Sequence, residues 1–150
     1  MNTILVNSIA ALTRSRLVTV SADAPLVDVA NLLSDTHISL VVVCDSGGAM
    51  VGVITKTNIV QQMGRSCDSI GVTMAAEVMT RNVTSCRPTH SLHDVLAMMD
   101  KSSFVHIPVV DENGVPCGVV NAGDSLRALM ADEKYEAALL RDYVMGIGYR

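Results

Sequence analysis

Two short polar motifs in the sequence have residue types that suit the binding of a polar or charged ligand. The first contains Thr55, Lys56 and Asn58, and the second contains Asn121 and Asp124. Each motif follows an apolar run and precedes a stretch of helical composition, so Asn58 and Asp124 stand near the start of a predicted helix. Asn and Asp are favoured helix N-caps, and free N–H groups at a helix start suit phosphate. The residues alone leave capping and ligand binding open, and one residue can serve both roles.

No pattern typical of an enzyme accompanies these motifs. The sequence contains no GxGxxG, P-loop or GxSxG motif, and no Cys–His or paired-carboxylate arrangement at recognisable spacing. The histidines lack the Cys or carboxylate partners that would complete a metal site, so we expect no metal and no catalytic cofactor. These histidines are His37, His90, His93 and His106. The sequence therefore favours binding over catalysis.

The composition limits the class of partner. A net charge of -4 argues against a nucleic-acid binder, and an aromatic content of 3% argues against base stacking. The four cysteines form no CxxC pair and indicate a reducing, cytoplasmic location. We expect no signal peptide, and no run approaches the roughly 18 apolar residues of a membrane span. Five cations are interpreted as solvated surface: Arg14, Arg16, Arg81, Arg87 and Lys101.

The elements that must position the two motifs repeat in the sequence at an offset of 66 residues. One apolar helical face, spaced i, i+3, i+4 and i+7, occurs in both copies. Its members are Leu26, Val29, Ala30 and Leu33 in the first copy, and Leu92, Val95, Leu96 and Met99 in the second. Asp45 and Gly52 recur as Asp111 and Gly118 at the same offset. A helix, a turn and a glycine in one register indicate a duplicated unit.

Each copy predicts a short strand, a helix, two strands joined by a turn, and a second helix. Continuous β-branched runs indicate buried strands, and segments rich in Asp, Asn and Gly indicate turns. In the first copy we predict strands at residues 17–20, 40–43 and 51–54, a turn at 45–48, and helices capped by Asp23 and starting near Asn58. In the second copy we predict strands at 83–86, 107–110 and 117–120, a turn at 111–114, and helices capped by Thr89 and starting near Asp124.

The predicted fold class is α/β (α+β), with two tandem βαββα repeats related by pseudo-two-fold symmetry. The repeats cover residues 8–63 and 76–131, and a linker covers 64–75. Units of about 60 residues are only marginally stable alone, so the repeats should pack on each other. Residues 132–150 predict a C-terminal helical extension, which we expect to pack on a partner subunit.

The ordered doublet resembles the cystathionine-β-synthase-type (CBS) domain pair, or Bateman module, over roughly residues 8–131. The matching segments are Thr19-Val20, Leu26–Ala30, Leu40–Val43 and Gly52–Ile59, and then Val78–Val83, Leu92–Leu96, His106–Asp111 and Gly118–Asp124. The resemblance implies clefts between the two sheets that bind AMP, ADP, ATP, NAD or S-adenosylmethionine, and a role in regulating another protein. The chain looks like the stand-alone CBS-pair proteins, including their C-terminal helix.

The resemblance also implies a ribose anchor, an acid at the end of a Gly-x-x-Ser/Thr-x-x-Asp pattern. Its carboxylate can accept hydrogen bonds from both ribose hydroxyls, and such charge-assisted bonds are the stronger kind. The first copy has Thr55 but carries Asn58 in place of the acid. The second copy has Asp124 but carries Asn121 in place of the hydroxyl residue. We therefore predict Asp124 as the better ribose anchor.

The remaining site residues would hold phosphate and adenine. Lys56 could meet a phosphate, and its counterpart in the second copy is Ala122, which favours phosphate binding on the first-copy side. The adenine would need an apolar slot with backbone groups at its edge. The residues that match this slot in the family are Thr19, Val20, Ile38, Ser39, Thr84, Ser85, Val105, His106 and Pro108. Ordinary sheet core is the alternative for each of them. Pro108 lacks a ladder donor, so we expect it at a sheet edge or cleft.

These observations predict a regulatory sensor that binds AMP, ADP, ATP or NAD, forms a homodimer and signals to a partner protein. The alternative is a dimerisation or scaffold module with degenerate sites, because each copy retains only half of the family's motif. We expect no enzymatic activity, no nucleic-acid partner and no membrane partner.

Overall fold

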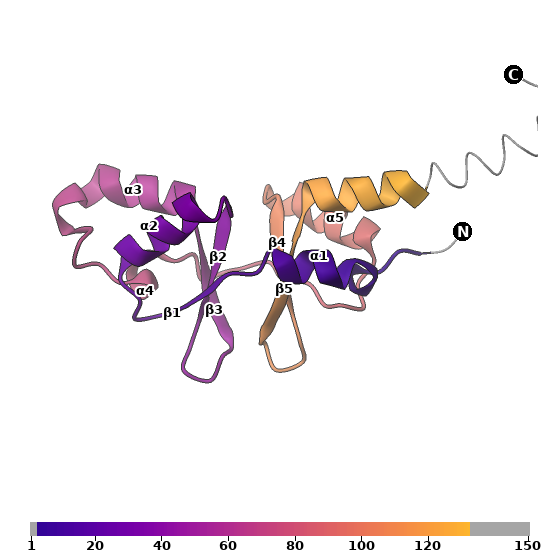
Figure 1. Ribbon diagram of the computed structural model, residues 1–150, viewed down its shortest axis with the longest axis horizontal. Coiled ribbons are helices and arrows are strands. Elements are labelled where there is room, and N and C mark those ends of the chain that lie inside the picture. Colours follow the sequence, from indigo (N-terminus) through magenta and orange to yellow (C-terminus); the bar gives the residue numbers. More distant parts are fainter. Residues whose placement is uncertain (1–2, 133–150) are drawn as a thin grey trace, which may run out of the picture.

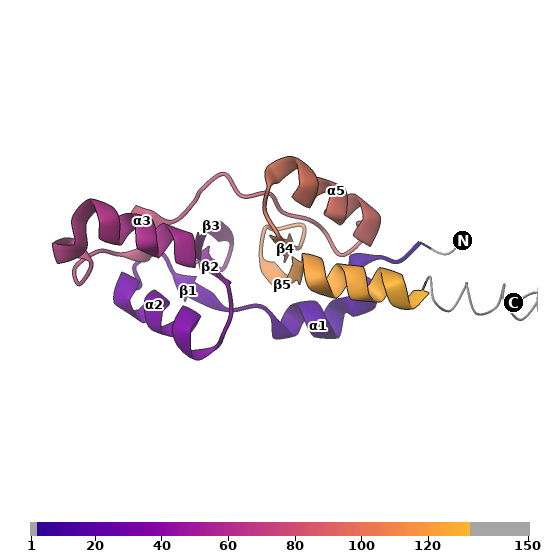
Figure 2. The same ribbon diagram turned by 90° about the horizontal axis from the view of Figure 1, so that it is seen from above.

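Two small β-sheets lie next to each other at the centre of the molecule, and the helices that pack on each sheet lie towards opposite ends (Figures 1 and 2). This computed structural model describes residues 3–132. The predicted C-terminal extension lies outside the described residues, apart from its first residue, Asp132. The two-repeat α/β architecture predicted from the sequence is confirmed. Within residues 3–132, no helix combines the length and the apolar character needed to cross a membrane.

The strands of the two sheets pair in the same register. The first sheet contains β1 (Thr19–Ser21), β2 (Leu40–Cys44) and β3 (Met50–Thr55), and the second contains β4 (His106–Val110) and β5 (Pro116–Asn121). β1 runs parallel to β2, whereas β2–β3 and β4–β5 are antiparallel hairpins. Leu40 pairs with Thr55 in the first hairpin, and His106 pairs with Asn121 in the second. Both pairings are offset by the 66 residues of the sequence repeat, so the duplication includes the strand register.

The turns that close the hairpins use the same hydrogen bonds. The Asp45 carboxylate accepts the N–H groups two and four residues later, at 2.9 and 3.0 Å, and Asp111 does the same at 2.8 and 3.0 Å. Gly48 and Gly114 adopt positive φ angles of 90° and 79°, which glycine adopts without steric cost. The tips also touch, because Met50 donates its N–H to the Gly114 carbonyl at 2.9 Å. The aspartates and glycines noted in the sequence thus define both turns.

The helices surround the outer sides of the sheets. Around the first sheet lie α2 (Leu26–Asp35), α3 (Lys56–Ser66), the short helix η2 (Cys67–Ser69) and α4 (Ala75–Val78). Around the second sheet lie η1 (Val6–Ile9), α1 (Ala10–Ser15), α5 (Leu92–Ser102) and a helix that covers residues 122–132. The predicted linker at 64–75 therefore contains the end of α3, a 3-10 turn and the start of α4.

The predicted caps of the first helix in each copy are wrong by two residues. Pro25 is the N-cap of α2 and makes no side-chain cap bond, whereas the backbone N–H of Asp23 bonds the Ser21 hydroxyl at 3.3 Å. Ser91, not Thr89, caps α5, and its hydroxyl accepts the Asp94 N–H at 3.0 Å. The hydroxyl of Ser91 stands at the spacing that reaches the N3 amide, and this decides the helix start.

The predicted strand at 83–86 is also wrong, because the second copy keeps only one parallel bridge there, between Cys86 and Val109. In the first copy, Val42 donates its N–H to the Val18 carbonyl at 2.9 Å. The counterpart of Val42 is Pro108, which has no N–H and cannot make that bond. Pro108 lies buried in β4, an outer strand of its two-stranded sheet, with its missing donor on the side away from β5. The segment before Cys86 is therefore released from the sheet.

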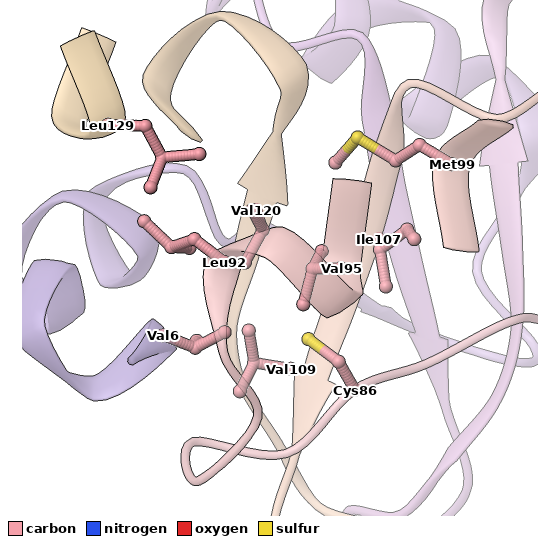
Figure 3. Packing of buried hydrophobic residues seen from close by; sticks show 9 residues of the cluster. All are labelled: Val6, Cys86, Leu92, Val95, Met99, Ile107, Val109, Val120 and Leu129. Carbon is pink, nitrogen blue, oxygen red and sulfur yellow. The ribbon is translucent and has the colours of Figure 1, made fainter. Parts of the chain in front are cut away.

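Each sheet is covered in part by the segment that precedes the other repeat. Val6 of η1 is buried against Leu92 in the core of the second repeat (Figure 3). Ala75 of α4 is buried against Leu26 in the core of the first repeat. Paired backbone bonds hold both segments: Val6 donates to the His90 carbonyl at 2.9 Å, and Ala75 donates to Ala24 at 2.8 Å. The two repeats are therefore joined by an exchange of segments as well as by face-to-face packing.

The repeated glycines allow these exchanged segments to approach the sheets. A Cβ added at Gly52 would lie 2.6 Å from Sδ of Met79, and one added at Gly118 would lie 2.6 Å from Oγ1 of Thr13. Real Cβ atoms do not approach other heavy atoms so closely. Met79 follows α4 and Thr13 belongs to α1, and they too are separated by 66 residues. Close approach of the crossing segment thus explains a glycine at both positions.

Candidate functional site

A cleft of about 520 Å³ lies between the two repeats, and it is called the first cleft below. The start of α3 and of β2 line it from the first repeat, and the stretch leading into β4 lines it from the second. Its lining residues are Ser39, Leu40, Val53, Thr55, Lys56, Thr57, Asn58, Gln61, Thr80, Val83, Thr84, Ser103, Phe104, Val105 and His106. Small-molecule sites generally have volumes of about 300–1,000 Å³. The first cleft therefore has room for a nucleotide.

Thr55 and Asn58 form a capping box at the start of α3. The Thr55 hydroxyl accepts the Asn58 N–H at 3.4 Å, and Asn58 Oδ1 accepts the Thr55 N–H at 2.8 Å. Thr55 is thus the N-cap, and Asn58 is the third helical residue rather than the cap. Asn58 Nδ2 donates to the Thr80 hydroxyl at 3.3 Å, from the segment that crosses to the second repeat. Capping engages Oδ1, whereas Nδ2 carries a second hydrogen that a ligand can accept.

The charged groups of the first cleft suit an anion. Lys56 is exposed at the first position of α3, where the unpaired N–H groups carry the positive end of the helix dipole. Among residues 3–132, no Asp or Glu lines the first cleft. His106 is half-buried and lines both clefts, and burial, followed by the positive charge of Arg16, lowers the pKa of its imidazole. His106 is therefore neutral near pH 7 and can donate one hydrogen bond and accept another.

The Asp124 motif lies beside a much smaller cleft, called the second cleft below. It has a volume of about 70 Å³ and is lined by Arg16, His37, Ile38, Ser39, Leu40, His106, Val119 and Asn121. Arg16 Nε bonds Asp124 Oδ2 at 3.0 Å, and a second Arg16 nitrogen bonds Oδ1 at 3.1 Å. Arg127 also bonds Oδ1, at 2.7 Å. The Asp124 side chain is only 1% exposed, so two guanidinium groups already cover its carboxylate.

These contacts determine the ionisation of Asp124. Burial alone would raise the pKa of the carboxyl, but hydrogen bonds from Arg16 and Arg127 and their positive charges outweigh it, so the pKa is lowered. The Asp124 N–H donates to Asn121 Oδ1 at 2.7 Å. Asn121 therefore holds the capping position that was predicted for Asp124, just as Thr55 does in the first repeat.

Comparison with known proteins agrees with this duplicated architecture. The model of the CBS domain family matches residues 9–65 and 75–131. The chain belongs to the CBS domain family. Its relatives include the CBS domain-containing protein YhcV of Bacillus subtilis, which is 27% identical over 128 residues, or 83% of this chain and 87% of the relative.

Solved structures of other CBS proteins have the same fold. A CBS-domain containing protein of Agrobacterium tumefaciens aligns with a TM-score of 0.73 and 27% identity, over 84% of this chain and 93% of that chain. The structure of CBSX2 in complex with AMP aligns with a TM-score of 0.74 and 22% identity, over 87% of this chain and 98% of that chain. At that identity the second likeness shows the fold alone.

The first cleft brings together predicted site residues from both CBS repeats. Those that line it are Ser39, Thr55, Lys56, Asn58, Thr84, Val105 and His106. Ile38, Ser39, His106 and Asn121 line the second cleft. Thr19, Val20, Ser85, Pro108 and Asp124 line neither cleft. Val20 packs on the first core, Pro108 is buried within β4, and Asp124 is buried behind Arg16. The hydroxyl and amide motif of one repeat thus faces the predicted adenine slot of the other.

The sequence did not indicate that Arg16 belongs to the second cleft. It was interpreted as solvated surface, yet it bonds a carboxylate 108 residues away. Its counterpart at the repeat offset is Asn82, so a cation without a matching cation was the only sequence signal. Several first-cleft residues were also missed, because they lie outside the two motifs: Thr57, Gln61, Thr80, Val83, Ser103 and Phe104.

Proposed function

We propose that this CBS pair binds an adenine nucleotide in the first cleft and thereby regulates another protein. The observation that carries the proposal is the cleft itself, a space of about 520 Å³ lined by both repeats. A ligand there would contact both halves of the molecule at once. Ligand binding can shift a conformational equilibrium only through different affinity for two states, and a site shared by two bodies provides such a difference.

The charges of the first cleft favour AMP, ADP, ATP or NAD over a cationic ligand. Lys56 and the start of α3 would hold a phosphate, and no carboxylate from the described part of the chain lines the cleft. Asn58 Nδ2 and the Thr80 hydroxyl would face the ribose. Phe104 and Val105 would provide the apolar surface for adenine. This pose explains why an amide can replace the family's acid here: the phosphate contact adds a charge-assisted bond.

Asp124 remains a predicted ribose anchor for the second cleft, but a nucleotide would first have to displace Arg16 from its carboxylate. The first nucleotide is therefore placed beside Asn58. This assignment reverses the preference drawn from the sequence, because the sequence did not reveal the guanidinium groups that cover Asp124.

Regulation would proceed through a homodimer in the cytoplasm. Figures 1 and 2 place α3 and the helix of residues 122–132 on the same face of the molecule. Val60 and Met63 of α3 are 65% and 53% exposed, and Leu126 and Met130 are 49% and 51% exposed. Apolar surface of this kind is commonly covered by a partner. A Met63→Glu variant should shift the mass measured by light scattering from dimer to monomer.

The four free cysteines suit a reducing compartment.

Titration of the purified protein with AMP, ADP, ATP and NAD tests the binding proposal. We expect saturable binding of at least one of them by calorimetry, and a higher melting temperature. A ligand at 100 times its dissociation constant adds about 2.7 kcal/mol of stability. No saturable binding up to millimolar ligand would contradict the proposal and favour the scaffold alternative, in which the module only dimerises.

A further inference from the structure

The two clefts occupy equivalent positions in the duplicated fold, yet they differ about sevenfold in volume, 520 against 70 Å³. The equivalence is visible in their lining at the 66-residue offset. Leu40 and His106 begin β2 and β4, and Val53 and Val119 lie on the paired strands β3 and β5, opposite Val42 and Pro108. The backbone is also equivalent before these strands, where His37 and Ser103 have positive φ angles of 56° and 62°. The backbone at the strand ends is therefore similar in the two clefts, although Val83 and Thr84 of the segment released from the second sheet line only the first cleft.

Arg16 is the side chain that distinguishes them. It is the last residue before the chain crosses from α1 towards β1, and it lines the second cleft. Its guanidinium bonds both oxygens of Asp124, at 3.0 and 3.1 Å, in the bidentate geometry that gives the strongest pairing with a carboxylate. Asn82, its counterpart, does not line the first cleft.

We propose that Arg16 is a built-in occupant of the second cleft, and that it restricts the wild-type chain to one nucleotide. The proposal rests on the proposed function in taking both clefts to accept the same class of ligand, an anionic adenine nucleotide. Asp124 stands where a ribose would be anchored, but its carboxylate is satisfied by Arg16 and Arg127. A ribose offers neutral hydroxyls in exchange for a charge-assisted pair, so the exchange is unfavourable while Arg16 is present.

Removal of the Arg16 guanidinium should reverse this balance. The carboxylate would then keep only Arg127, whose side chain is 71% exposed and does not line the second cleft. A buried carboxylate that has lost a partner binds a new donor more readily, because its lone pairs are no longer satisfied. The space left by the Arg16 side chain would adjoin the existing 70 Å³. The variant should therefore acquire a second nucleotide site that is anchored on Asp124.

The test is the number of nucleotides bound per chain, measured by native mass spectrometry and calorimetry with AMP, ATP and NAD. Wild type and Arg16→Ala are compared with Arg14→Ala as the matched control. Arg14 is an exposed cation on the same α1 helix, and no ion pair of Arg14 occurs among residues 3–132. We expect one nucleotide for wild type and Arg14→Ala, and two for Arg16→Ala. The double variant Arg16→Ala/Asp124→Asn removes the buried charge, and serves if the single variant folds poorly. It should also bind two, the second more weakly.

The number of nucleotides that a variant gains over the wild type tests the role of Arg16 separately from the proposed function. A gain of one nucleotide on removal of Arg16 supports the built-in occupant, even if the wild type binds none, in which case the first-cleft site fails alone. No gain in either Arg16 variant overturns the built-in occupant, whatever the wild type binds. Two nucleotides on the wild type also overturn it. One nucleotide on the wild type with no gain leaves the proposed function standing.

Discussion

The first and second clefts share the strand ends and helix starts that line them, and they differ most in the side chains placed there. Both lie where a strand pair meets the start of a helix, and both have an amide or hydroxyl cap, Thr55 in one and Asn121 in the other. In the first cleft the third helical residue is Asn58, which points a donor towards the space. Beside the second cleft it is Asp124, whose carboxylate bonds Arg16, and Arg16 lines that cleft. One acid in place of an amide, together with one arginine, thus separates an open site from a closed one.

The difference between the clefts can be tested most strongly by charge reversal at Lys56. Lys56→Glu should weaken binding of a phosphate-bearing nucleotide by about 1.5–3 kcal/mol, or roughly 10- to 150-fold, because a charge-assisted bond is lost. Glu is well tolerated at a helix start, so folding should not suffer. Lys101→Glu on α5 is the control, since Lys101 lines neither cleft. If calorimetry gives the same affinity for the two variants, the proposal that the first cleft binds the phosphate is contradicted.

Substitution of the glycines that contact the exchanged segments should destabilise the protein equally in both repeats. Gly52→Ala and Gly118→Ala each place a methyl group 2.6 Å from a neighbouring side-chain atom. We expect each to lower the free energy of unfolding by about 1–3 kcal/mol through overpacking. Gly64→Ala is the control, because a Cβ there meets no atom within 4 Å. Denaturant unfolding measures all three. A large loss at only one of the two glycines would show that the exchange is not symmetric.

The carboxylate of Asp124 should make stability depend on acid pH. Its pKa in the folded state is lowered from the ordinary value of 3.8, so the folded state favours the charged form. The contribution is therefore fully present above the ordinary pKa and is lost as the pH falls through the lowered folded value. At pH 7, Asp124→Asn should cost about 1–3 kcal/mol. The difference in the free energy of unfolding between wild type and variant, measured in urea, should shrink below about pH 4. A difference that does not depend on pH would contradict a stabilising ion pair.

The same Asp124→Asn variant shows which cleft holds the first nucleotide. If the ligand lies beside Asn58, its affinity should stay within about twofold of the wild type, well below the roughly tenfold change of 1.4 kcal/mol. A loss of tenfold or more, measured by calorimetry, would move the first nucleotide to the second cleft.

A small gain in the free energy of unfolding is expected from restoring the strand missing from the second sheet. Pro108→Val supplies the N–H that Val42 uses in the first sheet to bond the Val18 carbonyl. We expect a gain of about 0.5–1.5 kcal/mol, the usual net value of one hydrogen bond. Slow hydrogen exchange at the new amide of residue 108 would show that the strand at 83–86 has formed. Fast exchange there would mean that Pro108 is not what prevents it.

The repeat, its register and its turns could be predicted from the sequence because they depend on local residues. Asp45 and Asp111 accept N–H groups within four residues, so their roles are visible in a short window. The bond between Arg16 and Asp124 spans 108 residues, and no local pattern announces it. Pro108 was recognised as unable to donate, but its effect on a strand more than twenty residues earlier depends on which strand lies beside it. Prediction therefore failed where pairing at long range decides the outcome.

The exchange of segments has a consequence for how the gene product can be divided. An excised second half would lack Val6, and the faces of Leu92 and Val95 that η1 covers would meet water. An excised first half that stopped before Ala75 would lose the cover over Leu26 in the same way. Neither half can serve as an autonomous building block, and the whole should melt in one cooperative step.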